Sequence, residues 1–181
     1  MRQTKKNWQR GFTLMETMIA MSILAVGILG LAAMLGDSLA YMKGSQDDFI
    51  AQQKAEEAAE AIFTAKYNAN ATFAQVSNFG VGNPAGLFLP GPLPLTVPGP
   101  DGLVGSVNDT AAPLASIITP GPDKILGTAD DVLVPLTNFT RTIAITTVVG
   151  KPNLKQVVIT IDYTAGRWTR QYVLTTYVSS F

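Results

Sequence analysis

The feature that most constrains this chain is an apolar run near its N-terminus. Residues 12–35 read FTLMETMIAMSILAVGILGLAAML, in which Glu16 is the only charged residue and proline is absent. A helix of this length, rising about 1.5 Å per residue, measures about 36 Å and exceeds the ~30 Å hydrocarbon core of a bilayer. The sequence therefore predicts an N-terminal helix that can span a membrane.

Charge is distributed unevenly around this run. The chain has thirteen basic and thirteen acidic residues, but four basic residues (Arg2, Lys5, Lys6 and Arg10) lie in the first ten positions. A basic head before an apolar run is typical of a targeting segment, and the positive-inside rule keeps such a head in the cytoplasm. The remainder carries an acidic excess, so nucleic acid is an unlikely partner. We expect a single-pass membrane protein with its leader in the cytoplasm and its C-terminal domain on the other side of the membrane.

Composition excludes several kinds of chemistry. The chain contains no cysteine and no histidine, so disulfides, thiolate nucleophiles, zinc fingers and imidazole bases are all excluded. We find no nucleophile–base arrangement and no phosphate-binding loop. The sequence predicts a protein that is not an enzyme and that has no cofactor, unless oxygen ligands hold a cation.

Three interpretations of the apolar run compete. A cleaved secretory signal has an apolar region of about 7–15 residues; Ser38-Leu39-Ala40 resembles its cleavage site, but this run is longer. A plain signal anchor fits the length but does not explain Glu16, which would cost about 2.5–3.5 kcal/mol at the bilayer centre. An intramembrane carboxylate needs a partner, and the third interpretation supplies one.

The residues around the start of the run form a specific pattern. Lys5, Lys6 and Arg10 precede the segment GFTLME, and an unbroken apolar stretch follows it. This pattern closely resembles the class III signal of type IV pilins and type II secretion pseudopilins. The resemblance implies that a prepilin peptidase cuts after Gly11 and methylates the new amine on Phe12. It also implies that Glu16 guides assembly.

The implied processing has a physical rationale. Cutting after Gly11 removes the four leader cations and creates an α-amino group at a helix end that is already electropositive. The Glu16 carboxylate of a neighbouring subunit would neutralise that amine. Burying either charge alone costs much more than burying both, so the pair would set the axial register between subunits.

The resemblance is closest to minor pilins of the PilV-like subgroup, so we favour a minor subunit of a type IV pilus. Its partners would be the prepilin peptidase, the inner membrane and other pilin subunits, and it would pass from the membrane into the filament. A type II secretion minor pseudopilin and a major pilin remain alternatives, although many major pilins carry a proline in this helix and the first proline here is Pro84. A membrane-anchored exported binding module is the alternative from another class.

The helix is predicted to continue through residues 37–67. Glycines 27, 30 and 36 interrupt its apolar part, either as flexible points or as small residues that allow close helix packing. Further along, apolar residues recur at three- and four-residue steps and predict a stripe that must pack on another element, such as a small sheet. That stripe comprises Phe49, Ala51, Ala55, Ala58, Ala59, Ile62 and Phe63.

Residues 68–135 carry ten of the eleven prolines and are predicted to form loops and short edge strands. The pattern G-P-D-x-x-x-G-[ST]-x-[DN]-D occurs at 99–109 and again at 121–131, an offset of 22 residues. Its side-chain oxygens suit either a calcium site or a pair of Asx-type turns. If calcium binds, the predicted ligands are Asp123, Asp130 and Asp131.

Residues 136–181 contain three β-rich segments, 138–149, 154–163 and 167–178, separated by short turns. Alternating apolar and polar residues predict an antiparallel meander covered on one face. Basic and aromatic residues in these strands form either a binding patch or ordinary edge protection: Arg141, Lys155, Arg167, Trp168 and Arg170.

The predicted fold class is therefore α+β, with a long N-terminal helix packed on a C-terminal antiparallel sheet in a pilin-like manner. The segments expected along the chain are a leader (1–11), a transmembrane and assembly helix (12–36), an amphipathic helix half (37–67), a loop region (68–135) and the β-meander (136–181).

Overall fold

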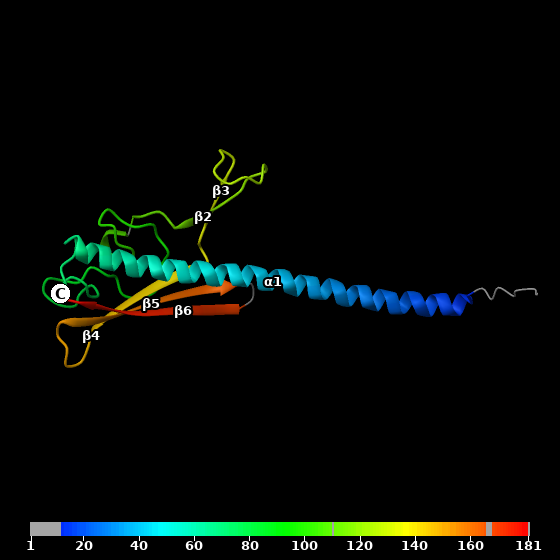
Figure 1. Cartoon of the computed structure of the whole chain (residues 1–181), viewed down its shortest axis with the longest axis horizontal. Coiled ribbons are helices and arrows are strands. Elements are labelled where there is room, and N and C mark those ends of the chain that lie inside the picture. The colour runs from blue at the N-terminus through cyan, green and yellow to red at the C-terminus, as the bar shows by residue number, and fades with distance from the viewer. Residues whose placement is uncertain (1–11, 110, 166–167, 181) are drawn as a thin grey trace, which may run out of the picture. The chain divides into compact units, whose positions relative to one another are not determined.

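The computed structural model describes residues 12–109, 111–165 and 168–180. The chain divides into two compact units, Met1–Met42 and Lys43–Phe181, which we call the N-terminal unit and the head unit and describe separately. Helix α1 covers Leu14–Tyr67 and so contributes residues to both units (Figure 1). It ends where Ala69 adopts a left-handed conformation with φ of 58°. The predicted continuation of the helix to residue 67 is confirmed.

The head unit is built on a four-stranded antiparallel sheet of order β1-β4-β5-β6. Its strands are β1 (Leu93–Pro94), β4 (Phe139–Thr147), β5 (Leu154–Ala165) and β6 (Trp168–Ser179). Consecutive hairpins join the last three strands, and the register pairs Ile143 with Ile159 and Ile159 with Leu174. The predicted α+β arrangement of a long helix and a C-terminal meander is confirmed.

The core of the head unit joins one face of α1 to one face of this sheet. Alternate β5 residues from Lys155 to Ala165 are buried, while the residues between them are partly or fully exposed. On α1, Ala51, Ala55 and Ala58 are completely buried, because side chains of one methyl group let a helix lie close to a flat sheet. One buried cluster therefore contains Ile50, Ala51, Ala55, Ala58, Ile62, Ile143, Val157, Ile159 and Ile161.

The sequence pattern placed three residues of α1 incorrectly. Phe49 and Phe63 were expected in the buried stripe, but they are 67% and 41% exposed. They lie fourteen residues apart, which is two heptads, so they share a helix face with the exposed Glu56 and Glu60. Asp47, which was expected among the polar positions, falls four residues before Ala51 and is buried.

The connecting region also contributes to the head core. Phe88, Leu95 and Leu103 are almost fully buried in the same cluster as the helix and sheet residues. Asn78 donates to the Ile143 carbonyl at 2.7 Å and accepts from the Ile145 amide at 2.9 Å, so its side chain bonds β4 beyond the short β1 pairing. The β4 edge is closed by these contacts.

A second, two-stranded antiparallel sheet lies within the connecting region. Strand β2 (Ser116–Thr119) pairs with β3 (Val132–Pro135). The second copy of the repeated motif, residues 121–131, lies between them; we call it the second acidic turn and the first copy, residues 99–109, the first acidic turn. We call residues 116–135 the arm. In Figure 1 the arm lies above α1, whereas β6 lies below it.

Lys155 fastens the start of the connecting region to the sheet. Its Nζ donates to the carbonyls of Phe73, Ala74 and Val76 at 2.7, 3.2 and 2.8 Å, and it lies 4.6 Å from the centre of the Phe73 ring. Burial lowers the pKa of Lys155. One ammonium group thus donates hydrogen bonds to three carbonyls of the segment that follows helix α1.

Lys155→Met should therefore lower the free energy of unfolding of the head unit by about 2–3 kcal/mol, since carbonyls left without a donor in a buried place are costly. Thermal unfolding of the detergent-solubilised chain would measure this loss. Lys151→Met, on the exposed turn between β4 and β5, is the matched control and should change stability by less than ~0.5 kcal/mol. Equal effects at the two positions would contradict the role given to Lys155.

Candidate assembly site

The start of α1 has the geometry of a helix N-cap. Thr13 precedes the first helical residue, and its Oγ1 accepts a hydrogen bond from the Glu16 amide at 3.3 Å. Thr13-Leu14-Met15-Glu16 is the sequence of a capping box, and it places a carboxylate in the first turn, where the helix dipole favours negative charge. Glu16 therefore occupies a position where its charge stabilises the first turn of the helix.

The described part of the N-terminal unit exposes its apolar side chains. All residues from 12 to 42 are exposed, with Phe12 and Leu14 each at 79%. In the described residues, α1 is the one helix that by length and composition could cross a membrane. Gly11 and the basic leader residues Arg2, Lys5, Lys6 and Arg10 lie outside the described residues. Phe12 and Glu16 are exposed on this unit, four residues apart.

The three glycines in the part of α1 that belongs to the N-terminal unit have free space around them. A Cβ added at Gly27, Gly30 or Gly36 would meet no atom within 4 Å apart from the local helix backbone. The helix continues through all three positions. Both interpretations of these glycines, flexible points and close packing with a second helix, stay predictions.

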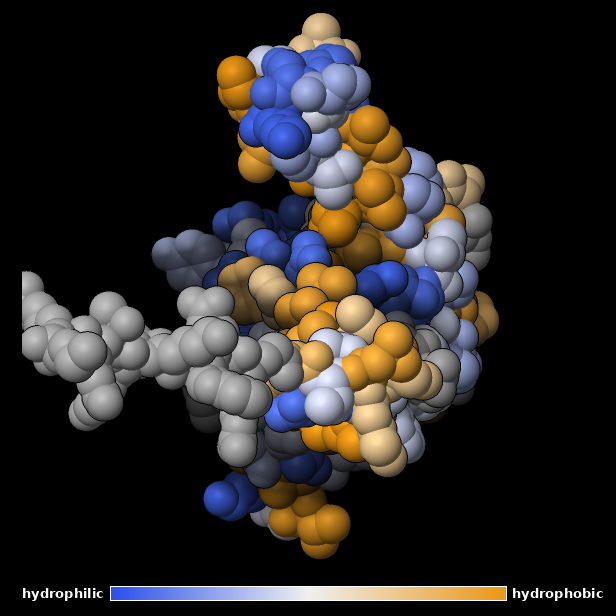
Figure 2. All heavy atoms as spheres, turned by 90° about the vertical axis from the view of Figure 1, so that its right-hand side faces the viewer, coloured by the Kyte–Doolittle hydropathy of each residue, from blue (hydrophilic) through white to orange (hydrophobic). Residues whose placement is uncertain are grey.

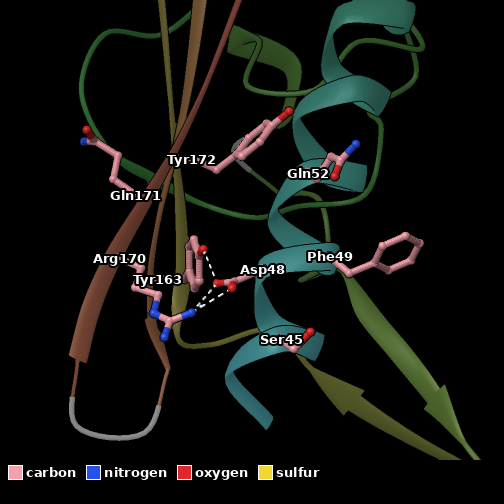
Figure 3. Close-up of a pocket in the computed structure, with 8 residues that line it drawn as sticks. All are labelled: Ser45, Asp48, Phe49, Gln52, Tyr163, Arg170, Gln171 and Tyr172. Carbon is pink, nitrogen blue, oxygen red and sulfur yellow. Dashed lines mark hydrogen bonds and ion pairs between the residues drawn. The ribbon is translucent and has the colours of Figure 1, made fainter. Parts of the chain in front are cut away.

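In the head unit, an ion pair links α1 to β6 (Figure 3). Arg170 Nη1 donates to both Asp48 carboxylate oxygens at 2.9 and 2.7 Å, and the Tyr163 hydroxyl donates to Asp48 Oδ1 at 2.6 Å. These residues line an open groove bordered by Phe49 and Tyr172. The groove therefore lies beside the β6 edge and has both polar and aromatic walls.

The pKa values of the two neighbouring aspartates of this region are shifted in opposite directions. The hydrogen bond from Tyr163, followed by Arg170, lowers the pKa of Asp48, whereas burial raises the pKa of Asp47. Burial together with the Asp48 carboxylate raises the pKa of Tyr163 to about 12. The charged form of Asp48 therefore stabilises the fold, whereas the charged form of Asp47 destabilises it.

The two acidic turns adopt closely similar conformations. Asp101 Oδ1 accepts from the Leu103 amide at 3.0 Å, and Asp123 Oδ1 accepts from the Ile125 amide at 2.9 Å. Left-handed φ values recur at the same offset of 22 residues, at Gly102 (72°) with Lys124 (59°) and at Gly105 (74°) with Gly127 (90°). The sequence repeat is therefore also a structural repeat.

The carboxylates of the second turn bond to its own chain. Asp130 accepts from the Thr128 hydroxyl at 2.7 Å and from the Asp123 amide at 3.2 Å, and Asp131 accepts from the Gly127 amide at 2.7 Å. The Thr128 hydroxyl, and then the Asp123 amide, lower the pKa of Asp130. These are the bonds expected of Asx-type turns. Within the described ranges no group of three acidic residues is placed to hold a metal, and calcium binding by Asp123, Asp130 and Asp131 stays a prediction.

For Arg141 and Lys155, both sequence interpretations, a basic and aromatic binding patch and edge protection by solvated charges, are wrong. Arg141 and Lys155 are 2% and 8% exposed, because both occupy core-facing positions of their strands. Arg170 pairs with Asp48, and Arg167 lies outside the described residues. Of the proposed set, Trp168 is well exposed, at 72%. The members of this set that the structure describes therefore do not form an exposed cationic surface for nucleic acid.

Arg141 acts inside the head unit. Burial lowers its pKa to about 10, against the opposing charges of Asp109 and Glu57. Burial likewise raises the pKa of Asp109, although the Ser106 and Gly105 amides stabilise its charge. The first acidic turn thus places a carboxylate near a buried guanidinium, which the spacing of residues in the sequence did not indicate.

Comparison with known proteins gives one family match. The model of the prokaryotic N-terminal methylation motif matches residues 9–32. No curated protein and no solved structure matches the chain. The match supports a type IV pilin-like, prepilin-type protein with an N-terminal membrane anchor, and such proteins are typically structural rather than enzymatic.

Asp48→Asn should lower the free energy of unfolding of the head unit by about 0.5–1 kcal/mol at pH 6, since the ion pair is partly exposed. The pKa of Asp48 is lowered in the folded state, so its contribution is complete above the ordinary value of about 3.9 and is lost as the pH falls through the lowered value. Thermal unfolding across pH 3–7 should therefore show the two proteins converging below about pH 4.

The adjacent Asp47→Asn is the matched control for this prediction. Removing a buried carboxylate whose Oδ2 has no hydrogen-bond partner among the described residues should leave stability unchanged or raise it at pH 6. Destabilisation of the Asp47 variant with no effect at Asp48 would reverse the roles assigned to the two carboxylates.

Proposed function

We propose that this protein is a minor type IV pilin-like subunit that a prepilin peptidase processes and that enters a filament through its N-terminal helix. The observation that carries the proposal is the match of residues 9–32 to the N-terminal methylation motif. The long exposed apolar helix and the α+β head are consistent with it. The protein would be structural and would have no catalytic residues.

Processing at Gly11 would convert the start of the helix into an assembly site. The peptidase removes the basic leader and methylates the amine of Phe12, which then begins a helix capped by Thr13. The amine and the positive end of the helix dipole both attract a carboxylate. Glu16 of an adjacent subunit supplies that carboxylate in an apolar environment, where an unpaired charge is costly.

The finer assignment rests on the sequence of the helix. Glu16 followed by SILAVGILGLA, without a proline, resembles minor pilins more than many major ones. A type II secretion minor pseudopilin and a major pilin use the same leader and are the nearest alternatives. An exported binding module anchored by the same helix would need no contact between subunits, and this difference provides a test.

Mass spectrometry of the N-terminal peptide, from protein isolated from its own membranes or sheared filaments, tests the processing step. We expect a chain that begins at Phe12 and carries one additional methyl group. A chain that begins at Met1, or at Tyr41 after signal-peptidase cleavage, would contradict pilin-type processing and favour the anchored or secreted binding module.

Glu16→Ala, measured beside Glu16→Asp, tests assembly separately. The alanine variant should still be inserted and cleaved but should be recovered in sheared filaments at no more than about a tenth of the wild-type level. The aspartate variant retains the negative charge and should be recovered in filaments at a level between those of the alanine variant and the wild type. Normal recovery of the alanine variant would show that Glu16 does not take part in assembly.

A further inference from the structure

The two long edges of the head sheet differ. On one side, β1 and the Asn78 side chain cover β4, and β1 is only two residues long and contains Pro94. On the other side, β6 pairs only with β5 among the described strands. Twelve consecutive register pairs show that β6 has no bulge, and it contains no proline. The sheet thus has one closed edge and, from Thr169 to Tyr177, an open edge of about 30 Å that no other described strand pairs with.

The arm is a sheet too small to be stable by itself, so further strands would stabilise it. Two strands of four residues form it, and an isolated two-stranded ribbon is at best marginally stable in water. Its apolar side chains are nevertheless exposed, including Ile118 at 59% and Leu133 at 67%. Figure 2 shows the arm projecting from the head with hydrophobic atoms on its surface.

The structural repeat indicates what kind of surface the arm lacks. In the first acidic turn, the apolar pair Leu103 and Val104 is 1% and 0% exposed within the head core. The equivalent pair in the second turn, Ile125 and Leu126, is 60% and 61% exposed. The same turn conformation therefore occurs once with its apolar pair packed on a sheet and once without such a partner. An apolar protein surface would bury the second pair as the head core buries the first.

The open edge offers such a surface on the other side of the molecule. Trp168 on β6 and the neighbouring Phe49 on α1 are 72% and 67% exposed. The arm and β6 lie on opposite sides of α1 in Figure 1. Two complementary surfaces on opposite sides of one domain cannot satisfy each other within a chain, but they generate a head-to-tail contact that repeats from copy to copy.

We propose that the arm of one subunit docks on a second copy of this chain, with β3 along the open edge of β6. The apolar pair Ile125 and Leu126 is then covered by the exposed aromatic residues beside that edge. Strand addition supplies backbone hydrogen bonds between β6 and the outward-facing groups of β3. These groups are the amide and carbonyl of Leu133 and the carbonyl of Pro135, which has no amide hydrogen. The proposal rests on the proposed function, because assembly through the N-terminal helix is what brings heads together. The contact needs only two adjacent copies, so it applies to a minor subunit that occurs in a short cluster.

The absence of cysteine from the sequence permits a direct test in the full chain. We would introduce Leu133→Cys on the arm and Val173→Cys on β6, and treat membranes and sheared filaments with a bismaleimide. The double variant should form a ladder of linked chains. Coexpressed single variants should form dimers only, since each chain then provides one half of the contact. Val149→Cys on the exposed β4–β5 turn (98% exposed), combined with Val173→Cys, should not form a ladder.

Leu126→Asp added to the double variant tests the apolar pair. We expect the linked fraction to fall about tenfold, because burying a leucine favours association by roughly that factor or more. Val149→Asp is the matched control and should leave the linked fraction unchanged. An unchanged fraction in the Leu126 variant would overturn the part of the proposal that concerns the second acidic turn.

Two results would overturn docking as a whole. Dimers formed by the Leu133→Cys variant alone would indicate an arm-to-arm contact, and the absence of a ladder would exclude the proposed pairing. The N-terminal peptide mass from the same samples separates this failure from failure of the proposed function. Methylated Phe12 without a ladder means that the protein is processed as a pilin but does not use this contact.

Discussion

The head unit depends on burial of the alanine-rich face of α1 in one cluster with the apolar face of β4 and β5. Alanines at 51, 55 and 58 are fully buried, so a larger side chain at any of them would have to displace the sheet. The remaining stabilising contacts build on this layer. Asp48 reaches Tyr163 and Arg170 from the same helix, and Lys155 secures the segment that follows the helix to the strand that the alanines cover.

Periodicity and composition predicted the parts of the fold that many residues specify together. The long helix, the meander and the buried face of β5 each follow from a repeated spacing, so a single unusual residue does not obscure them. The same spacing failed for Phe49, Phe63 and Asp47, where residue type and helix position disagree. Hydrophobicity favoured burial of the two phenylalanines, but the position of the alanine stripe decided which face meets the sheet.

The polar contacts of the candidate site could not be predicted in this way. Asp48 and Arg170 are 122 residues apart, and Asn78 bonds a strand 65 residues away. Such pairs are formed by tertiary packing, and a single sequence does not indicate them. Local signals were more informative: the recurring turn motif indicated either a calcium site or Asx-type turns, and both copies form Asx-type bonds. Thr13 and Glu16 have the capping-box spacing, from which the helix cap could also have been predicted. Arg141 and Lys155 were misplaced because cations are rarely buried.

The duplicated turn has a consequence for how this chain can vary. In the first copy, substitutions at Leu103 or Val104 change core packing and therefore fold stability. In the second copy the same conformation is held by its own aspartates and glycines, while its apolar pair contributes nothing to the core. That copy can therefore change in sequence without a loss of stability in the head. The chain therefore has one turn whose apolar pair is constrained by packing in the head core, and a second whose apolar pair is constrained only by the contact proposed for it between copies.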